Sequence, residues 1–290
     1  MYLNRLAYKV TIVVDTTERI TLETSLMAQT HQHGSWFNTY GLPQQQQSRI
    51  FAFPYSGAGS LAYHKWAQAY RNSATDFLSV QLPGRENRFN EPPPDDLPKL
   101  VSTLAKAINP LLDKPYVFFG HSLGALLAFE LCRELRRQGQ PLPVHLIVSA
   151  FRSPEHPNPN RVLHRLSDPD LISAIGAYGG TPPQVLANKE LMGLLLPMLR
   201  ADFKLHETYR YQDDSPLPCP LTALTGTTDP FVTHAHMQNW QQQTTARFQH
   251  LPLTGGHFFL NIQHDTINQL LKHTLAGQPY AYSAYPSQHT

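Results

Sequence analysis

The stretch from Tyr116 to Cys132, YVFFGHSLGALLAFELC, limits the possible fold of this chain more than any other. β-Branched and aromatic residues come first, then Gly-His-Ser-Leu-Gly, then apolar residues mixed with good helix formers. In a Gly-x-Ser-x-Gly pattern between a buried strand and a helix, the serine occupies a tight turn and its hydroxyl points out of the sheet. The stretch therefore predicts that Ser122 is a nucleophile, while a packing turn with a surface serine remains the alternative.

Short apolar runs alternate with helical patterns along most of the chain, which is typical of a mostly parallel sheet covered by helices. We expect strands at 49–54, 77–82, 116–120, 145–150, 221–226 and 247–253. The helix after Gly120 is expected to run to about Gln138 and to end at Gly139, which tolerates a left-handed backbone. The predicted class is α/β, with the α/β-hydrolase fold: a central sheet flanked by helices and a helical lid insertion.

The two ends of the chain differ in composition from its middle. Residues 1–48 are polar in long stretches and lack sustained periodicity, so we expect an N-terminal extension that is flexible in part. Residues 49–276 are expected to form one hydrolase domain, in which residues 152 to about 210 are a lid over the active site. The last residues, 277–290, lack the apolar content needed for order and are expected to form a flexible tail.

Charge and cysteine usage exclude several classes of partner. The chain has 23 basic and 21 acidic residues, too even a balance for an extended phosphate-binding surface, so we expect no nucleic acid. Cys132 and Cys219 form neither a zinc pattern nor a disulfide framework, which favours a reducing, cytoplasmic setting. The apolar run from Val10 to Val14 is too short to span a membrane, so no membrane partner is expected.

A serine hydroxyl is a poor nucleophile at neutral pH, so it needs a base that a third group orients. In α/β-hydrolases these partners follow the serine in the chain, the acid first and the histidine last. Asp229 follows the apolar strand of LTALTGTTDPFV, and His257 follows that of HLPLTGGHFFL. Asp213 and Asp214 precede their strand in a polar loop and fit this order less well. We therefore predict a catalytic triad of Ser122, Asp229 and His257.

Three other histidines lie in positions where a chemical role has to be weighed against a structural one. His121 adjoins the nucleophile, but adjacent side chains diverge at a turn, so we interpret it as a packing or surface residue. His234 and His236 form a His-x-His pair without further ligands nearby, and on a helix they would not share a face. We therefore predict no metal site and no cofactor, and interpret this pair as surface residues.

An acyl-transfer site also needs donors for the oxyanion, usually two backbone N–H groups. Leu123, directly after the nucleophile, supplies the first. The glycine-rich loop FPYSGAGS follows the strand at 49–54, and there Ser56 or Gly57 would supply the second. We assign Ser56 as this donor, with a simple tight turn as the alternative interpretation.

Seven segments together resemble one known family, the type II thioesterases that accompany nonribosomal peptide and polyketide synthases. They are FPYSGAGS, Trp66, VQLPGRENR, FGHSLGA, LPMLRADFKLHETYRY, TGTTDPFV and GGHFFL, and the resemblance runs from about Arg49 to Leu275. The resemblance places the family's triad on Ser122, Asp229 and His257. It implies hydrolysis of acyl thioesters on the phosphopantetheine arm of acyl or peptidyl carrier protein domains, by a monomer that removes aberrant groups.

The chain departs from the family at one loop, where Phe-Pro-x-Ala-Gly-Gly is usual and Ser56, Gly57 and Ala58 occupy the last three positions. A medium-chain acyl thioesterase or a general esterase is the nearer alternative function. A non-catalytic binding protein on the hydrolase scaffold is the alternative from another class. Arg161 and Arg165, near the start of the insertion, are weighed as contacts for an acidic carrier protein against an ordinary solvated face.

Overall fold

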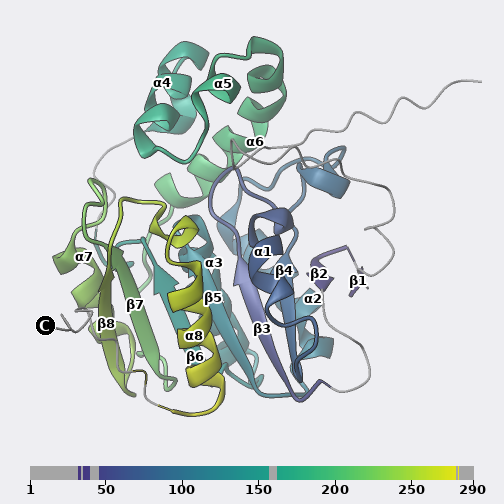
Figure 1. Ribbon diagram of the computed structural model, residues 1–290, viewed down its shortest axis with the longest axis vertical. Coiled ribbons are helices and arrows are strands. Elements are labelled where there is room, and N and C mark those ends of the chain that lie inside the picture. Colours follow the sequence, from purple (N-terminus) through teal and green to yellow (C-terminus); the bar gives the residue numbers. More distant parts are fainter. Residues whose placement is uncertain (1–31, 34, 40–45, 157–161, 279, 281–290) are drawn as a thin grey trace, which may run out of the picture.

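A single sheet with helices on both faces forms the body of the protein in the computed structural model, which describes residues 32–33, 35–39, 46–156, 162–278 and 280 (Figure 1). Within these residues the sheet has eight strands in the order β1-β2-β4-β3-β5-β6-β7-β8. The strands are β1 (Gln32–His33), β2 (Phe37–Thr39), β3 (Ser48–Phe53), β4 (Thr75–Val80), β5 (Tyr116–His121), β6 (His145–Ser149), β7 (Leu221–Gly226) and β8 (Phe248–Leu253). The helices are α1 (His64–Gln68), α2 (Leu97–Ile108), α3 (Leu123–Arg137), α4 (Asp168–Tyr178), α5 (Pro183–Leu186), α6 (Lys189–Glu207), α7 (His234–Gln238) and α8 (His264–Leu275).

All six strands predicted from the sequence are confirmed, and β3 through β8 pair in parallel. The expected helix is confirmed as α3, and Gly139 just beyond it has φ +64°, the left-handed conformation that ends helices. Strands β1 and β2 lie in the N-terminal extension, for which no strand was predicted. Strand β2 lies in the polar extension and pairs antiparallel with β4, placing Phe37 beside Val80. A three-residue strand is too short to show the alternation by which strands are recognised.

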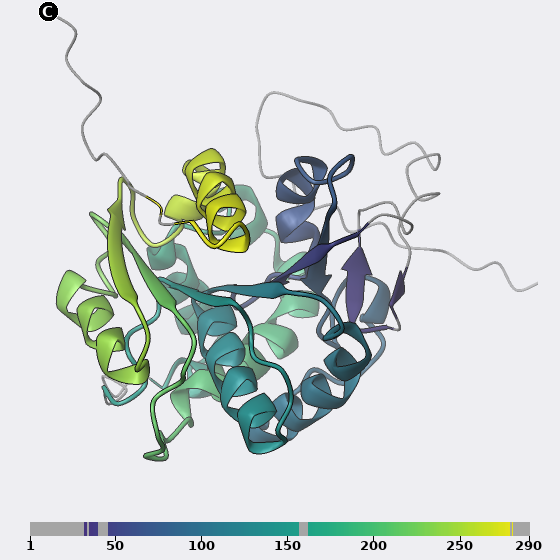
Figure 2. The ribbon, with the colours of Figure 1, turned by 90° about the horizontal axis from the view of Figure 1, so that it is seen from below.

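Alternating side chains of the strands build two hydrophobic cores, one on each face of the sheet. Figure 2 shows the helices that cover these two faces. In β3, Phe51 and Phe53 point into the core beneath α2 and α3, whereas Ile50 and Ala52 point into the core beneath α1 and α8. All four side chains are fully buried. Burial on both faces explains why these strands are continuously apolar in sequence, as parallel sheets require.

Strands β3 and β5 lie side by side at the centre of the sheet, while β4 lies on the other side of β3. The chain therefore turns in opposite directions after β3 and after β5. In open α/β sheets, the carboxyl ends of two such strands enclose the crevice where ligands bind. Here those ends carry the loop with Ser56 and the turn with Ser122, so the topology alone brings the two segments together.

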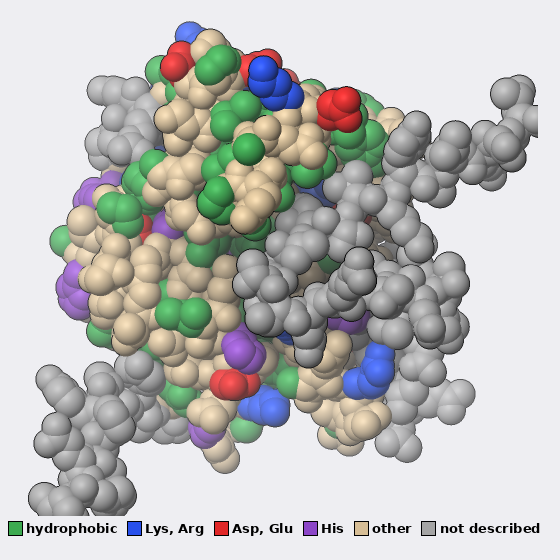
Figure 3. Space-filling model, turned by 45° about the horizontal axis from the view of Figure 1, so that its top comes forward, with side chains coloured by type: hydrophobic (Ala, Val, Ile, Leu, Met, Phe, Trp, Pro, Cys, Tyr) green, Lys and Arg blue, Asp and Glu red, His purple; other side chains and the backbone are tan. Residues whose placement is uncertain are grey.

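The segment between β6 and β7 contains α4, α5 and α6, which stand above the carboxyl ends of the strands (Figure 1). Its helices share a small core of their own, made of Leu163, Leu171, Ile175, Met192, Leu196, Met198, Leu199 and Phe203. Within the expected insertion, the turn Leu163–Arg165 and helices α4 to α6 thus form a helical unit over the edge of the sheet where Ser122 lies. Hydrophobic side chains are scattered among polar groups on the surface at this end of the molecule (Figure 3).

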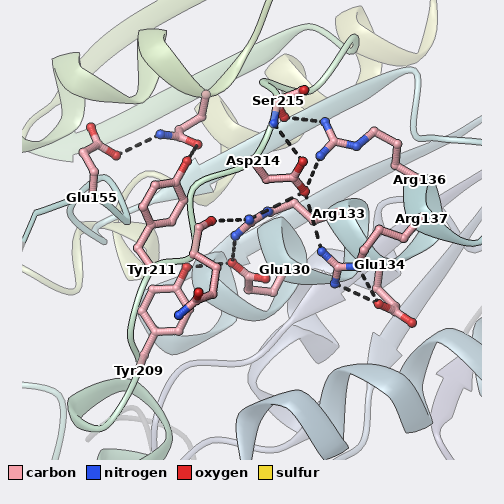
Figure 4. A network of polar contacts seen from close by, with 12 residues as sticks. Glu130, Arg133, Glu134, Arg136, Arg137, Glu155, Tyr209, Tyr211, Asp214 and Ser215 are labelled. Atoms are coloured by element: carbon pink, nitrogen blue, oxygen red, sulfur yellow. Dashed lines mark hydrogen bonds and ion pairs between the residues drawn. The ribbon is translucent and has the colours of Figure 1, made fainter.

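After α6, the chain returns to the body along the C-terminal half of α3 (Figure 4). Asp214 forms an ion pair with Arg136 at 2.6 Å and lies 3.7 Å from both Arg133 and Arg137. Tyr209 donates a hydrogen bond to Glu130 at 2.6 Å. Three arginines on one helix therefore hold the connection between the insertion and β7.

Within the described residues, the fold has no helix long and apolar enough to cross a membrane. Cys132 and Cys219 are free, buried thiols. Burial raises the pKa of the Cys219 thiol to about 11, so at neutral pH the side chain is an uncharged packing group. The flexible tail predicted for 277–290 falls mostly outside the described residues.

Candidate active site

The turn from β5 into α3 holds Ser122 in a backbone conformation that L-residues rarely adopt, with φ 53° and ψ −122°. The flanking glycines explain how so tight a turn can pack. A Cβ at Gly120 would lie 2.1 Å from the carbonyl oxygen of Gly124, and a Cβ at Gly124 would lie 2.1 Å from that of Phe53. Only glycine fits at these two positions. The Ser122 N–H donates to Ser149 O at 2.8 Å, which ties the turn to β6.

The structure brings together the three residues predicted as a triad. His257 Nε2 lies 3.2 Å from Ser122 Oγ, and His257 Nδ1 lies 2.8 Å from Asp229 Oδ2. These are hydrogen-bond distances of the kind that link a nucleophile, its base and the group that orients the base. Asp229 follows β7 and His257 follows β8, so the parallel strands place all three side chains at one edge of the sheet.

The carboxylate of Asp229 is held on both of its oxygens. Oδ1 accepts hydrogen bonds from the N–H groups of Phe231 at 2.8 Å and Val232 at 3.1 Å, which leaves Oδ2 for His257. The side chains of Asp229 and His257 are 0% and 4% exposed. A buried carboxylate bonded to Nδ1 orients the imidazole and fixes its tautomer. The competing acids play no such part, because Asp214 is bound to the arginines of α3 and Asp213 is exposed.

His121 packs behind the site, as its position in the turn predicted. It is fully buried, and its Nδ1 lies 2.8 Å from Ser149 Oγ. Burial, reinforced by the nearby His257, holds the pKa of His121 well below its usual range. The ring therefore stays neutral and adds no charge beside the base.

Aromatic rings that the sequence did not identify surround the imidazole of His257. Phe258 lies 5.2 Å and Tyr178 lies 5.4 Å from it, measured between ring centroids. Tyr178 comes from α4 of the insertion and stacks on Phe231 at 4.0 Å. These contacts limit the access of water to the base and show that the insertion reaches the site. No spacing rule connects Tyr178 to His257, so sequence patterns gave no signal for it.

The two predicted oxyanion donors lie at the ends of neighbouring strands. Leu123 is the first residue of α3, and an N–H in the first turn of a helix has no acceptor within that helix. In the loop after β3, the N–H of Gly57 donates to Asp202 at 2.8 Å and that of Ala58 donates to Tyr55 O at 3.0 Å. The N–H of Ser56 is thus the donor that this turn can offer to a substrate.

The segment PGRENR, recognised in the sequence without a role, packs on the same loop. Glu86 accepts from the N–H of Ser60 at 3.1 Å, from the Ser60 hydroxyl at 2.7 Å and from the N–H of Leu61 at 3.0 Å. Glu86 has φ 50°, a strained conformation for a side chain of its size. Because burial is the dominant influence, the pKa of Glu86 is raised despite these hydrogen bonds.

The remaining candidates lie elsewhere. His236 takes part in a capping box with Thr233 at the start of α7, whereas the ring of His234 lies 4.1 Å from that of His250. Across the described part of the chain, no group of three or more His, Cys, Asp or Glu side chains is arranged to hold a metal. Arg165 is exposed in the short helical turn Leu163–Arg165, and Arg161 lies outside the described residues.

Comparison with known proteins agrees with this geometry. A family model for the thioesterase domain matches residues 48–276. The chain is 38% identical over 260 residues to the linear gramicidin dehydrogenase LgrE of Brevibacillus parabrevis, covering 88% of this chain and 98% of that protein. It is 39% identical over 229 residues to the gramicidin S biosynthesis protein GrsT of Aneurinibacillus migulanus, covering 79% and 89%.

Among solved structures, the type II thioesterase BorB from the borrelidin biosynthetic cluster superposes with a TM-score of 0.78 and 34% identity, covering 84% of this chain and 99% of that one. The matched residues include the turn with Ser122 and the loops with Asp229 and His257. A family match over most of the chain, full-length relatives and the hydrolase architecture lead to one conclusion. The chain belongs to the thioesterase family and is a type II thioesterase of the α/β-hydrolase fold.

Proposed function

We propose that this chain hydrolyses acyl thioesters carried on the phosphopantetheine arm of carrier protein domains, with Ser122, His257 and Asp229 as its catalytic triad. The observation that carries the proposal is the chain of two contacts from Ser122 Oγ to His257 Nε2 at 3.2 Å and from His257 Nδ1 to Asp229 Oδ2 at 2.8 Å. It lies at the carboxyl edge of the sheet, beneath the insertion.

The first half of the reaction forms an acyl-enzyme. His257 takes the proton of the Ser122 hydroxyl as Oγ attacks the thioester carbonyl, and the negative charge moves to the carbonyl oxygen. The N–H groups of Leu123 and Ser56 stabilise that oxyanion. Asp229 stabilises the imidazolium that forms, because its carboxylate is buried and already bonded to Nδ1.

Collapse of the tetrahedral intermediate breaks the carbon–sulfur bond. A thiol has a pKa of about 8.5, far below that of an alcohol, so the pantetheine sulfur leaves as a thiolate with little help from an acid. It then takes the proton from His257. Thioesters therefore suit a site whose base lies in an aromatic, poorly hydrated environment.

Hydrolysis of the acyl-serine completes the cycle. His257 takes a proton from water, hydroxide oxygen adds to the acyl carbon, and Ser122 leaves with the proton returned by the imidazolium. Side chains and backbone groups of the chain supply every step, so the proposal calls for no cofactor and no metal.

The substrate class comes from the relatives. GrsT is a gramicidin S biosynthesis protein, and BorB belongs to a borrelidin biosynthetic cluster. We assign to this chain the same place beside a nonribosomal peptide or polyketide synthase, where it removes aberrant acyl groups that block carrier domains. The chain is also 33% identical over 221 residues to the medium-chain thioesterase of human fatty acid synthase. Release of free fatty acids is therefore the alternative function that an experiment has to test.

The name of LgrE raises oxidoreduction as another function. A dinucleotide site uses a glycine-rich turn so that the pyrophosphate approaches the helix N-terminus closely. Here the space at Gly120 and Gly124 is filled by backbone atoms of Gly124 and Phe53. Ser122, at the head of the helix, instead lies within hydrogen-bond distance of His257. The turn is therefore built for a nucleophile.

The decisive experiment compares three substrates: an acetyl-phosphopantetheinyl carrier protein, acetyl-CoA and p-nitrophenyl acetate. We expect the highest kcat/KM with the carrier-bound thioester. Ser122→Ala serves as the control and should abolish turnover of all three.

Each contrary result points to one alternative. A preference for the free oxygen ester would identify a general esterase, and faster hydrolysis of a medium-chain acyl thioester than of the acetyl thioester would favour the medium-chain thioesterase. Failure of a fluorophosphonate probe to label Ser122 in the wild-type protein would contradict the triad and revive the non-catalytic binding protein.

A further inference from the structure

A buried ion pair that the reaction does not use lies beside the oxyanion loop, residues 56–61. Arg85 and Asp202 form two parallel hydrogen bonds, from Nη1 to Oδ2 at 2.8 Å and from Nη2 to Oδ1 at 2.7 Å. Their side chains are 4% and 0% exposed. The two residues come from PGRENR and LRADF, the segments that separate this sequence most clearly from other hydrolases.

Both members of the pair also bind the backbone of the oxyanion loop. Asp202 Oδ2 accepts the N–H of Gly57 at 2.8 Å, and Arg85 Nη1 donates to the carbonyl oxygen of Ala58 at 2.9 Å. The N–H of Gly57 belongs to the same peptide plane as the carbonyl of Ser56. Holding that plane therefore fixes the backbone directly after Ser56, the residue whose own N–H faces the substrate.

The loop is held at its far end by Glu86, through the N–H groups of Ser60 and Leu61. Apart from these polar contacts, Gly57 packs closely against Leu199 of α6, because a Cβ at Gly57 would lie 2.7 Å from Leu199 Cδ2. Burying a charged pair costs desolvation free energy that apolar residues of similar volume would avoid. The presence of a buried charged pair here therefore calls for a role beyond filling space.

We propose that the Arg85–Asp202 pair is a positioning device that orients the Ser56 N–H as an oxyanion donor and makes catalysis depend on the placement of α6. This inference rests on the proposed acyl-serine mechanism. Asp202 lies on α6, which belongs to the insertion, while Arg85 and Gly57 belong to the body. The pair is therefore the polar link by which the insertion fixes the geometry of the oxyanion site.

The first test is Asp202→Asn, which keeps the size of the side chain and removes its charge. We expect kcat for p-nitrophenyl acetate and for the acetyl carrier protein to fall about 10²-fold, because a donor displaced by about 1 Å loses most of its value. KM should stay within about threefold, since the oxyanion exists only in the transition state. Arg85→Lys keeps the charge without the bidentate fork and should lose kcat in the same way.

Glu207→Gln is the matched control. Glu207 lies later on α6, its side chain is 2% exposed, and it accepts the N–H groups of Leu163 and His164 within the insertion. We expect this variant to lower Tm and to leave kcat within about twofold of the wild type. A loss of kcat equal to that of Asp202→Asn would mean that any damage to α6 has this effect, and would overturn the proposal.

The double variant Arg85→Met with Asp202→Leu separates stability from catalysis. Removing both charges together avoids an unpaired buried ion, so Tm should recover toward the wild-type value. We expect kcat to remain low, because nothing then holds the Gly57 N–H. Recovery of kcat together with Tm would show that the pair only supports the fold.

The rate at which a fluorophosphonate labels Ser122 makes the result independent of the natural substrate. The phosphonyl oxygen occupies the oxyanion site, so labelling should slow in Asp202→Asn and in the double variant but not in Glu207→Gln. If the wild type fails with carrier thioesters yet the labelling order holds, the substrate assignment falls and the positioning role stands. Unchanged labelling in Asp202→Asn would refute the positioning role alone.

Discussion

The two ends of helix α3 are held in opposite ways. At its N-terminus, Ser122 sits in a strained turn where backbone atoms of Gly124 and Phe53 pack too closely for any side chain. At its C-terminal half, the partly exposed Arg136 pairs with Asp214, and together with the buried Arg133 and other charged residues it holds a returning loop (Figure 4). The glycines at the first end permit no larger side chain, whereas the second end is held by a set of small and separable contributions.

This difference follows from what each end has to do. A nucleophile must be fixed to within a fraction of an ångström, and close backbone packing provides that rigidity. The helix dipole also favours negative charge at the N-terminus, where the oxyanion forms, and cations near the C-terminus. The C-terminal half only has to hold the chain in place, for which exposed ion pairs of modest strength are sufficient.

The largest expected effect is at the nucleophile. Ser122→Ala should lower kcat for the thioester at least about 10⁴-fold, because no other group can form the acyl-enzyme. The free energy of unfolding should change by less than about 1 kcal/mol, since the strained backbone remains and the side chain is not part of the core. Turnover assays and urea unfolding of the same preparation check both statements. A large loss of stability would mean that the hydroxyl also supports the fold.

The glycines at the two ends give the sharpest contrast in stability. Gly124→Ala should cost about 3 kcal/mol or more or prevent folding, because the new Cβ would meet the carbonyl oxygen of Phe53 at 2.1 Å. A Cβ at Gly139 would have no atom within 4 Å. Gly139→Ala should therefore lower the free energy of unfolding only by about 1 kcal/mol, the cost of holding alanine at φ +64°. Urea unfolding measures both, and equal losses would contradict the contrast between the ends.

Acid should weaken the N-terminal end first. Burial lowers the pKa of His121, so this group binds a proton in the unfolded chain near pH 6.5 but not in the folded one. Its stabilising contribution is present above about pH 6.5 and is lost as the pH falls below that value. His121→Asn should therefore show a smaller loss of unfolding free energy between pH 7.5 and 4.5 than the wild type.

The carboxylate at the C-terminal half behaves differently. Burial acts to raise the pKa of Asp214, but the N–H of Ser215 and the charge of Arg136 outweigh it, and the net pKa is lowered. Its contribution is present above about pH 3.8, the ordinary value for Asp, and is lost only below it. Asp214→Asn should thus follow the wild-type pH slope above about pH 4.5, and a changed slope there would contradict this order of titration.

The smallest expected effect is the loss of the contribution that Asp214 makes to the free energy of unfolding. Asp214→Asn should lower the free energy of unfolding by about 1 kcal/mol, because its side chain is 31% exposed and solvent screens its three arginine contacts. The loss should shrink in 1 M salt, and kcat should not change. Asp213→Asn is the control, since Asp213 is exposed, and it should have no measurable effect.

Most of the fold, and the meeting of Ser122, Asp229 and His257 at one edge of the sheet, could be predicted because they depend on local rules. Buried parallel strands are continuously apolar, the turn at Ser122 has its own glycine pattern, and the order of Asp229 and His257 follows the topology. Contacts between distant segments could not be predicted in this way. Tyr178 reaches His257, and Asp202 reaches Gly57, across chain separations that no periodicity encodes.

The motif LRADF shows where the limit lies. Leu199 and Phe203 are buried on α6, as apolar side chains of a packed helix are. The acidic residue between them, Asp202, is also buried. The role of Asp202 depends on its ion pair with Arg85, which lies 117 residues earlier in the chain.

Strand β2 changes where the folding unit begins. Phe37 is 1% exposed and its ring lies 5.6 Å from that of Phe51, while Trp36 lies under the guanidinium of Arg88 at 4.2 Å. A chain shortened to residue 48, where the family match starts, would uncover the hydrogen-bonding edge of β4 and an apolar gap beside it. Open edges of this kind recruit strands from other molecules. We therefore expect a form that begins at residue 48 to aggregate more readily than one that retains the short antiparallel strand β2.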